Sequence, residues 1–320
     1  MRETEYAYAV ARIRSNEVSL LTSADMEQLM AASDYAAAVR ILADKGWDIP
    51  EKGEKFDIAE RELSKAWELI AESAPDASLL EALVIGNDFF NVKAAVKCVF
   101  SDREPSECYV YPCITDTELI TKAVTENDFD ILPEFLAKPA LEAYEAVSKR
   151  ESGQLAEIII DKAALEARIE YAGKAASVLL LRIAELYAAA ANIKSALRCR
   201  KTGKSRDFAL EAMCGCKTDN GELYANAGST NSMAEYLLTT EYAFLSDSVK
   251  KGFTAFEKQC DNSVVSWLES AKYETFGPDP LVAYYYAKQA ESKNVRIILS
   301  AKASGIPAQA ITERVRDIYV

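Results

Sequence analysis

A pattern near the C-terminus organises this chain: Tyr284-Tyr-Tyr-Ala-Lys-Gln-Ala-Glu-Ser-Lys-Asn294-Val-Arg-Ile-Ile-Leu-Ser-Ala-Lys302-Ala-Ser-Gly305-Ile-Pro307. It occurs twice more upstream when the copies are aligned on an asparagine, at Asn91, Asn192 and Asn294. The copies are separated by 101 and 102 residues, close to one third of the 320-residue chain. A common separation of this size predicts one structural unit that is written three times.

Each copy has the features of a helix. An aliphatic residue stands one and five positions after each asparagine, a spacing that puts both side chains on one helix face. In the second and third copies a cation follows at eight positions and a glycine at eleven, as is typical of a helix end. These residues are Arg200 with Gly203 and Lys302 with Gly305. The first copy has Val99 and Asp102 at these positions instead.

We therefore predict an all-α protein with three similar helical-bundle domains, at residues 1–110, 111–215 and 216–320. The 12 glycines and 9 prolines are few for this length, which also favours helix over sheet. Asparagine is mildly unfavourable inside a helix, so we expect the three repeated asparagines to fix the register of each bundle by hydrogen bonding. The alternative is that they line a common surface.

Local signals predict where helices begin and end. Thr22 or Ser23 is a candidate N-cap for a short helix. Prolines should interrupt the helices of the second third of the chain at Pro133 and Pro139.

The longest uninterrupted helical pattern runs from about residue 157 to 200. Its apolar residues step by four and three positions alternately, as in helices packed lengthwise. A short final helix should begin at Pro307, because proline suits the first turn of a helix.

Composition excludes several classes of protein. The net charge is −13 and every third of the chain is acidic, which disfavours nucleic acid as a partner. No segment approaches the roughly 20 apolar residues that span a bilayer, and the N-terminus lacks the pattern of a signal peptide. We therefore expect a cytoplasmic chain that meets a membrane only through partners. The seven cysteines are expected to be reduced thiols.

The sequence offers little for catalysis. Histidine is absent, which removes the usual general base near neutral pH and the commonest transition-metal ligand. The segment Gly203-Lys204-Ser205 lacks the earlier glycine of a phosphate-binding loop. We predict no catalytic residue, no cofactor and no metal. One weaker alternative is a zinc site built from Cys108, Cys113, Cys214 and Cys216. Another is a magnesium site that includes Asp128 and Asp130.

The densest group of cations follows the second repeated asparagine. One interpretation is a helix end whose positive side chains meet exposed carbonyl groups. The other is an electrostatic contact with an acidic partner surface, and the sequence leaves both open. The candidate interface residues are Lys194, Arg198, Arg200, Lys201, Lys204 and Arg206.

Several segments together resemble a known family. They are Tyr-Ala-Tyr-Ala-Val-Ala-Arg-Ile-Arg at 6–14, Leu20-Leu21-Thr22, Gly86-Asn-Asp-Phe-Phe-Asn-Val-Lys93, and the C-terminal pattern through Tyr319-Val320. With these segments the chain resembles the C subunits of the A-type/V-type ATPases, whose eukaryotic relatives are called d subunits. The resemblance covers essentially the whole chain and is weakest in the middle third.

The resemblance implies a funnel of three similar helical domains around a pseudo-threefold axis. Such a protein is the central-stalk adaptor of a rotary ATPase: it receives the shaft subunits and sits on the cytoplasmic loops of the membrane rotor ring. It transmits torque for ion transport coupled to ATP synthesis or hydrolysis, and it has no catalytic activity of its own. The protein would then lie at the cytoplasmic face of the membrane.

Other possibilities stay open at this stage. A free-standing helical-repeat scaffold for soluble partner proteins would have the same composition. The sequence also leaves open whether the ion is a proton or sodium, and whether the first helix packs against the third repeat.

Overall fold

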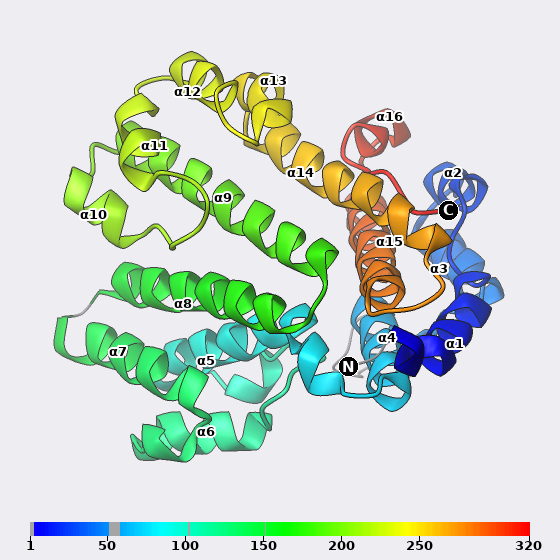
Figure 1. Ribbon diagram of the computed structural model, residues 1–320, viewed down its shortest axis with the longest axis horizontal. Helices are drawn as coiled ribbons and strands as arrows, with labels where there is room; N and C mark the ends of the chain where they lie inside the picture. The colour runs from blue at the N-terminus through cyan, green and yellow to red at the C-terminus, as the bar shows by residue number, and fades with distance from the viewer. Residues whose placement is uncertain (1–2, 51–57, 102, 151) are drawn as a thin grey trace. The chain divides into compact units, whose positions relative to one another are not determined.

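The computed structural model describes residues 3–50, 58–101, 103–150 and 152–320, and every regular element in these ranges is a helix (Figure 1). The prediction of an all-α fold is therefore confirmed. The arrangement of three domains around a pseudo-threefold axis, with the boundaries 1–110, 111–215 and 216–320, stays a prediction. The residues group into two compact units, which we describe separately.

Unit 1 combines the two ends of the chain: Met1–Ser78, Ala176–Leu180 and Thr254–Val320. Its α-helices are α1 (Ala7–Glu17), α2 (Ser23–Ala31), α3 (Tyr35–Asp44), α4 (Ile58–Ser73), α14 (Phe253–Leu268), α15 (Asp279–Ala303) and α16 (Ala308–Thr312). Two short 3-10 helices accompany them, η1 (Glu3–Tyr6) and η6 (Glu269–Tyr273).

The core of unit 1 forms where α15 lies along α4, with α1 and α3 also in contact with α15 (Figure 1). α15 carries Asn294, so the third repeat helix is packed on helices from the start of the chain. A buried hydrogen bond joins the two helices where Ser292 Oγ donates to the carbonyl oxygen of Ala59, at 3.2 Å. The buried apolar residues at this junction include Leu21, Leu29, Leu42, Ile58, Val295 and Ile298.

Unit 2 contains the middle of the chain, Leu79–Ala175 and Leu181–Phe253. Its α-helices are α5 (Ile85–Val99), α6 (Thr117–Glu126), α7 (Glu134–Arg150), α8 (Gly153–Lys174), most of α9 (Val178–Lys201), α10 (Arg206–Glu211), α11 (Asn220–Asn226), α12 (Thr230–Leu237) and α13 (Ser246–Lys250). The 3-10 helices are η2 (Ala77–Leu83, shared with unit 1), η3 (Pro105–Glu107), η4 (Phe129–Ile131) and η5 (Ala243–Leu245).

The first repeat helix, α5, is the centre of the larger core in unit 2. α6, α7 and α8 all pack against it (Figure 1). Its apolar face, with Phe89, Val92 and Val96, is almost completely buried among Ile120, Leu136 and other residues of the surrounding helices. The pair predicted by the spacing after Asn91 is therefore part of a packed core.

The helix boundaries confirm one local prediction and contradict another. Thr22 is the N-cap of α2, and its side chain accepts a hydrogen bond from the backbone of Asp25, whose carboxylate caps Thr22 in return. Pro139 does not interrupt α7, contrary to our expectation. The helix continues because burial of Leu136, Ala140 and Ala143 along one face offsets the one backbone hydrogen bond that proline cannot form.

The predicted helix from about residue 157 to 200 is also wrong, because it consists of α8 and α9. The break lies at Ala176, whose φ of 51° is left-handed and cannot continue a helix. Ser177 then starts α9, since its hydroxyl oxygen accepts a hydrogen bond from the backbone N–H of Leu180 at 2.9 Å. Periodicity alone cannot show such a break, because the apolar spacing continues through it.

The glycines of the repeat end two helices in the same way. Gly203 and Gly305 both have a φ of 66°, in the left-handed region that glycine adopts at low cost. The residue after each glycine donates a backbone hydrogen bond to the carbonyl five positions earlier, Cys199 at 2.9 Å and Ala301 at 2.9 Å. This is the helix end that the sequence predicted for the second and third copies.

Alanine at position 203 is expected to destabilise unit 2 by about 1 kcal/mol, because the backbone there is left-handed. An added Cβ would meet no atom within 4 Å, so backbone strain is the only cost. Gly173→Ala is the matched control: it lies in α8 with equally free space, and alanine favours the helix there. Urea midpoints should move in opposite directions for the two variants. If the urea midpoint of Gly203→Ala is equal to or above that of the wild type, the left-handed backbone at residue 203 does not require glycine.

Candidate functional site

The repeated asparagine of α5 is a backbone clamp. Asn91 is completely buried, and its Nδ2 donates to the carbonyl oxygen of Val110 at 3.0 Å. The N–H of Val110 donates back to Asn91 Oδ1 at 2.8 Å. The planar side-chain amide thus pairs with a backbone residue as a neighbouring strand would. The segment that follows α5 is thereby held against the helix.

The other two copies repeat this geometry. Asn192 bonds to Cys214 in the same two-point fashion, with N···O distances of 2.9 and 3.0 Å. Asn294 bonds to Arg316, with distances of 3.0 and 2.8 Å. We call these three pairs the asparagine clamps. The clamped residue lies 19 positions after the asparagine in the first copy and 22 positions after it in the other two.

The clamps explain why an amide stands at a buried helical position. Without the asparagine, the clamped residue would lose the hydrogen-bond partner of its backbone N–H and C=O. Where these atoms are buried, as in the Cys214 clamp, the loss costs about 1–3 kcal/mol per group. The alternative, that the asparagines line a common surface, requires exposed side chains, whereas all three are at most 1% exposed. That the clamps fix the register of each bundle remains a proposal.

Carboxylates add a second tether that sequence analysis missed. Asp88, completely buried on α5, accepts backbone hydrogen bonds from Ile114 at 3.0 Å and Thr115 at 2.6 Å. Burial raises the pKa of Asp88, and these hydrogen bonds oppose the rise. On α9, Glu185 accepts from the N–H of Lys217 at 3.0 Å. The signal for Asp88 was its position three residues before Asn91, on the same helix face.

The predicted cationic group lies at the end of α9 and in the turn after it. Arg198, Arg200 and Lys201 occupy the last turn of the helix. Arg198, Arg200, Lys201 and Arg206 are exposed, whereas Lys194 and Lys204 are half-buried. We call these six residues the α9 cationic patch. Its position agrees with both interpretations of the sequence, a capped helix end and a partner surface.

Three cations of the α9 cationic patch lie close to aromatic rings. The Arg198 guanidinium lies 5.3 Å from the ring centre of Phe253, and that of Arg200 lies 5.2 Å from Tyr224. Lys204 lies 4.8 Å from Phe208. Among the residues that the structure describes, no carboxylate pairs within 4.0 Å with Arg198, Arg200, Lys201, Lys204 or Arg206. These five charges are therefore not neutralised within the described chain.

A buried charge cluster in unit 1 was also missed. Lys288 on α15 lies 3.2 Å from Glu291 and 3.6 Å from Glu62 of α4, and all three are less than a tenth exposed. The backbone N–H of Leu21 donates to Glu291, and Lys65 pairs with Glu62 at 3.0 Å. Burial raises the pKa of Glu291 to about 7, and Lys288 opposes the rise. The cluster joins α15 to α4.

The candidate metal ligands of the sequence do not form a cluster in the part of the chain that the structure describes. In residues 3–50, 58–101, 103–150 and 152–320, no three Cys, Asp or Glu side chains gather as metal ligands would. The candidate cysteines at 108, 113, 214 and 216 are free thiols. None of the described helices combines the length and the apolar character that a bilayer span needs.

Comparison with known proteins places the chain in a family. The family model of the ATP synthase (C/AC39) subunit matches residues 9–314, which include all three repeated asparagines. The chain belongs to this family. It is 23% identical to the C subunit of the V-type sodium ATPase of Enterococcus hirae over 326 aligned positions, covering 98% of this chain and 99% of that protein.

Membership of the ATP synthase (C/AC39) subunit family agrees with the resemblance found in the sequence. The match is continuous over both units, so the family relation holds for the whole architecture and not for one segment. The family is described as an ATP synthase subunit, and the relative is a subunit of a V-type sodium ATPase, so membership implies partner proteins within a complex. The α9 cationic patch and the three repeated asparagines lie inside the matched region.

Proposed function

We propose that this chain is the central-stalk adaptor of a V-type/A-type rotary ATPase, joining the shaft to the membrane rotor ring. In this role it transmits torque between ATP synthesis or hydrolysis and ion transport, without catalysing either. The observation that carries the proposal is the family match over residues 9–314, with full-length similarity to the C subunit of a V-type sodium ATPase. The proposed site of action is the cytoplasmic face of the membrane.

The clamps support a mechanical role. An adaptor under torque must keep its loops from yielding, and the weakest parts of a helical bundle are the segments between helices. Here the segment after each repeat helix is tied back by two hydrogen bonds, and in the first copy Asp88 adds more. Close-packed cores then pass strain from helix to helix.

We also propose that the α9 cationic patch binds an acidic surface of a shaft or ring subunit. Arg198, Arg200 and Lys201 are exposed and lack carboxylate partners in the described chain. By contrast, Lys93 and Lys174 pair with carboxylates of their own unit. Unpaired cations on an otherwise acidic protein raise the rate and the selectivity of binding to an acidic partner.

Affinity capture from detergent-solubilised membranes tests both proposals. We expect the full chain to capture shaft and ring subunits at moderate salt. Reversing three patch charges, with Arg198→Glu, Arg200→Glu and Lys201→Glu, should weaken the capture about tenfold, because each reversal replaces attraction by repulsion. Added salt should weaken capture by the wild type, whereas capture by the variant should not weaken, because salt screens attraction and repulsion alike.

A matched control carries three reversals elsewhere: Lys122→Glu, Lys138→Glu and Lys149→Glu, on exposed positions of α6 and α7. It should capture as the wild type does. If patch and control variants behave alike, the patch is not part of the interface. If the wild type brings down soluble proteins and no ATPase subunits, the chain is a helical-repeat scaffold and the adaptor role is wrong.

A further inference from the structure

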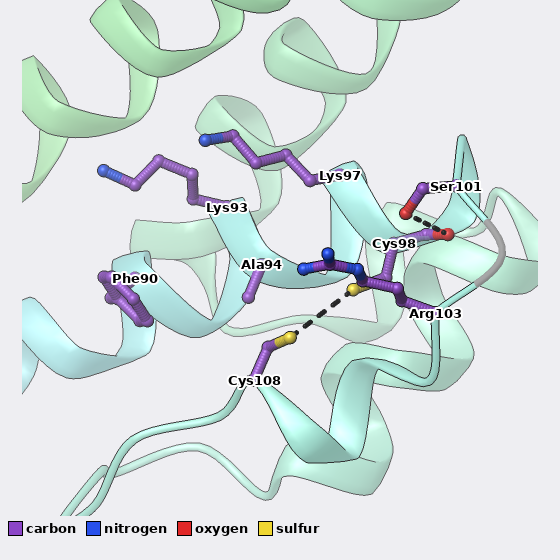
Figure 2. Close-up of a pocket in the computed structure, with 8 residues that line it drawn as sticks. All are labelled: Phe90, Lys93, Ala94, Lys97, Cys98, Ser101, Arg103 and Cys108. Atoms are coloured by element: carbon purple, nitrogen blue, oxygen red, sulfur yellow. Dashed lines mark hydrogen bonds between the residues drawn. The ribbon is translucent and has the colours of Figure 1, made fainter.

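Two thiols face each other beside the first clamp. Cys98 Sγ and Cys108 Sγ are 3.9 Å apart. Figure 2 shows the two sulfur atoms directed toward one another. Cys98 is buried in the last turn of α5, whereas Cys108 is half-buried just after η3. Thiols in van der Waals contact need only a small side-chain rotation to reach the bond length of a disulfide, about 2.05 Å.

A cavity gives small molecules access to this pair. It has a volume of 460 Å³ and is lined by Phe90, Lys93, Ala94, Lys97, Cys98, Ser101, Arg103 and Cys108 (Figure 2). Phe90, Lys97 and Arg103 are exposed, so the cavity opens at the surface of unit 2. The two sulfur atoms therefore lie where a dissolved oxidant can reach them.

The lining is cationic. Lys93 pairs with Asp161 and Lys97 with Glu157, both carboxylates of α8. Arg103 has no carboxylate within 4.0 Å among the residues that the structure describes. Its guanidinium is thus available to a negatively charged molecule that enters the cavity.

Cys98 and Cys108 both lie between the two residues of the first asparagine clamp, Asn91 and Val110. Cys98 follows the clamping Asn91 by seven residues, and Cys108 precedes the clamped Val110 by two. The first copy lacks the glycine that ends the helix in the other two copies. A disulfide between Cys98 and Cys108 would tie the segment after α5 to the helix, as the hydrogen bonds between Asn91 and Val110 do.

We propose that Cys98 and Cys108 are a reversible disulfide site, oxidised by a small anionic disulfide that enters the cavity. The Cys108 thiolate, the more accessible of the two, attacks one sulfur of the incoming disulfide and releases one thiolate. Cys98 then loses its proton and attacks Cys108 Sγ, which releases the second thiolate. Two protein thiols and one small disulfide give one protein disulfide and two small thiols.

The test oxidises the purified, fully reduced chain with glutathione disulfide, blocks the remaining thiols by alkylation and maps the peptides without reduction. The expected product links the peptides of Cys98 and Cys108, with a mass lower by two hydrogen atoms, and dithiothreitol reverses it. Amide exchange at Val110 should slow at least several-fold after oxidation, because the bond closes the loop next to it.

Two variants make the result specific. Cys108→Ser should remove the linked peptide. Cys199, a buried thiol elsewhere in unit 2, is the internal control: in the wild type and in Cys108→Ser it should be alkylated only after unfolding. The rate with glutathione disulfide, divided by the rate with neutral hydroxyethyl disulfide, should fall about fivefold in Arg103→Gln. An unchanged ratio would overturn the anionic preference. The proposed disulfide site would be overturned if Cys98 and Cys108 were still alkylated after prolonged incubation with glutathione disulfide. It would also be overturned if either cysteine formed a disulfide with another cysteine of the chain.

Discussion

Replacing Asn294 by alanine is expected to lower the free energy of unfolding by about 2–4 kcal/mol. The variant loses both hydrogen bonds of the third clamp and leaves the N–H and C=O of Arg316 without their partner. It also leaves a small cavity at a position with no solvent exposure. Urea unfolding followed by circular dichroism measures the change.

A matched control is Asn226→Ala, at an asparagine of α11 whose Nδ2 bonds to the carbonyl of Glu222 on the protein surface. Its loss should be within about 0.5 kcal/mol of zero, because water replaces an exposed partner. Asn91→Ala and Asn192→Ala should resemble Asn294→Ala if the three clamps are equivalent. A loss at Asn294 no larger than that of the control would show that the clamp does not stabilise the fold.

Replacing Lys288 by methionine is expected to cost about 3–5 kcal/mol at about pH 8. Methionine fills a similar volume, so packing against Trp47 is largely kept and the effect reports on charge. The change leaves the carboxylates of Glu62 and Glu291 buried. Among the described residues of the cluster, the cation that remains is Lys65, beside Glu62.

The same variant should lose less stability at about pH 6. Burial raises the pKa of Glu291 from its ordinary value of 4.5 to about 7, so the folded protein binds a proton that the unfolded chain releases between these values. The contribution of Glu291 to stability therefore falls as the pH rises through this window. In the folded protein Glu291 is mostly neutral below a pH of about 7, so at pH 6 it depends less on a neighbouring cation.

The double variant Lys288→Met, Glu291→Gln tests this explanation. Removing the second charge should restore part of the stability at pH 8 and should flatten the difference between the two pH values. Denaturant midpoints of the wild type, both single variants and the double variant form the cycle. Additive losses at both pH values would mean that Lys288 and Glu291 are not energetically coupled.

Some of the candidate site could be predicted because it depends on local spacing. The repeat placed Asn91, Asn192 and Asn294 at equivalent helical positions, and mid-helix asparagine indicated a polar partner. The identity of each partner could not be predicted, since Val110, Cys214 and Arg316 are held by their backbone atoms. A backbone group carries no sequence signal.

Some features of the fold could likewise be predicted from the sequence, and others could not. Composition and apolar periodicity were enough for an all-helical chain, a threefold pattern and glycine-ended helices at 203 and 305, because these depend on residues within a few turns of each other. The packing of α15 on α4 and α1, the Lys288 cluster and the contact of Cys98 with Cys108 required the folded chain. Such contacts join distant segments whose attraction is mostly non-directional burial, so many pairings suit the same pattern until one packs without voids.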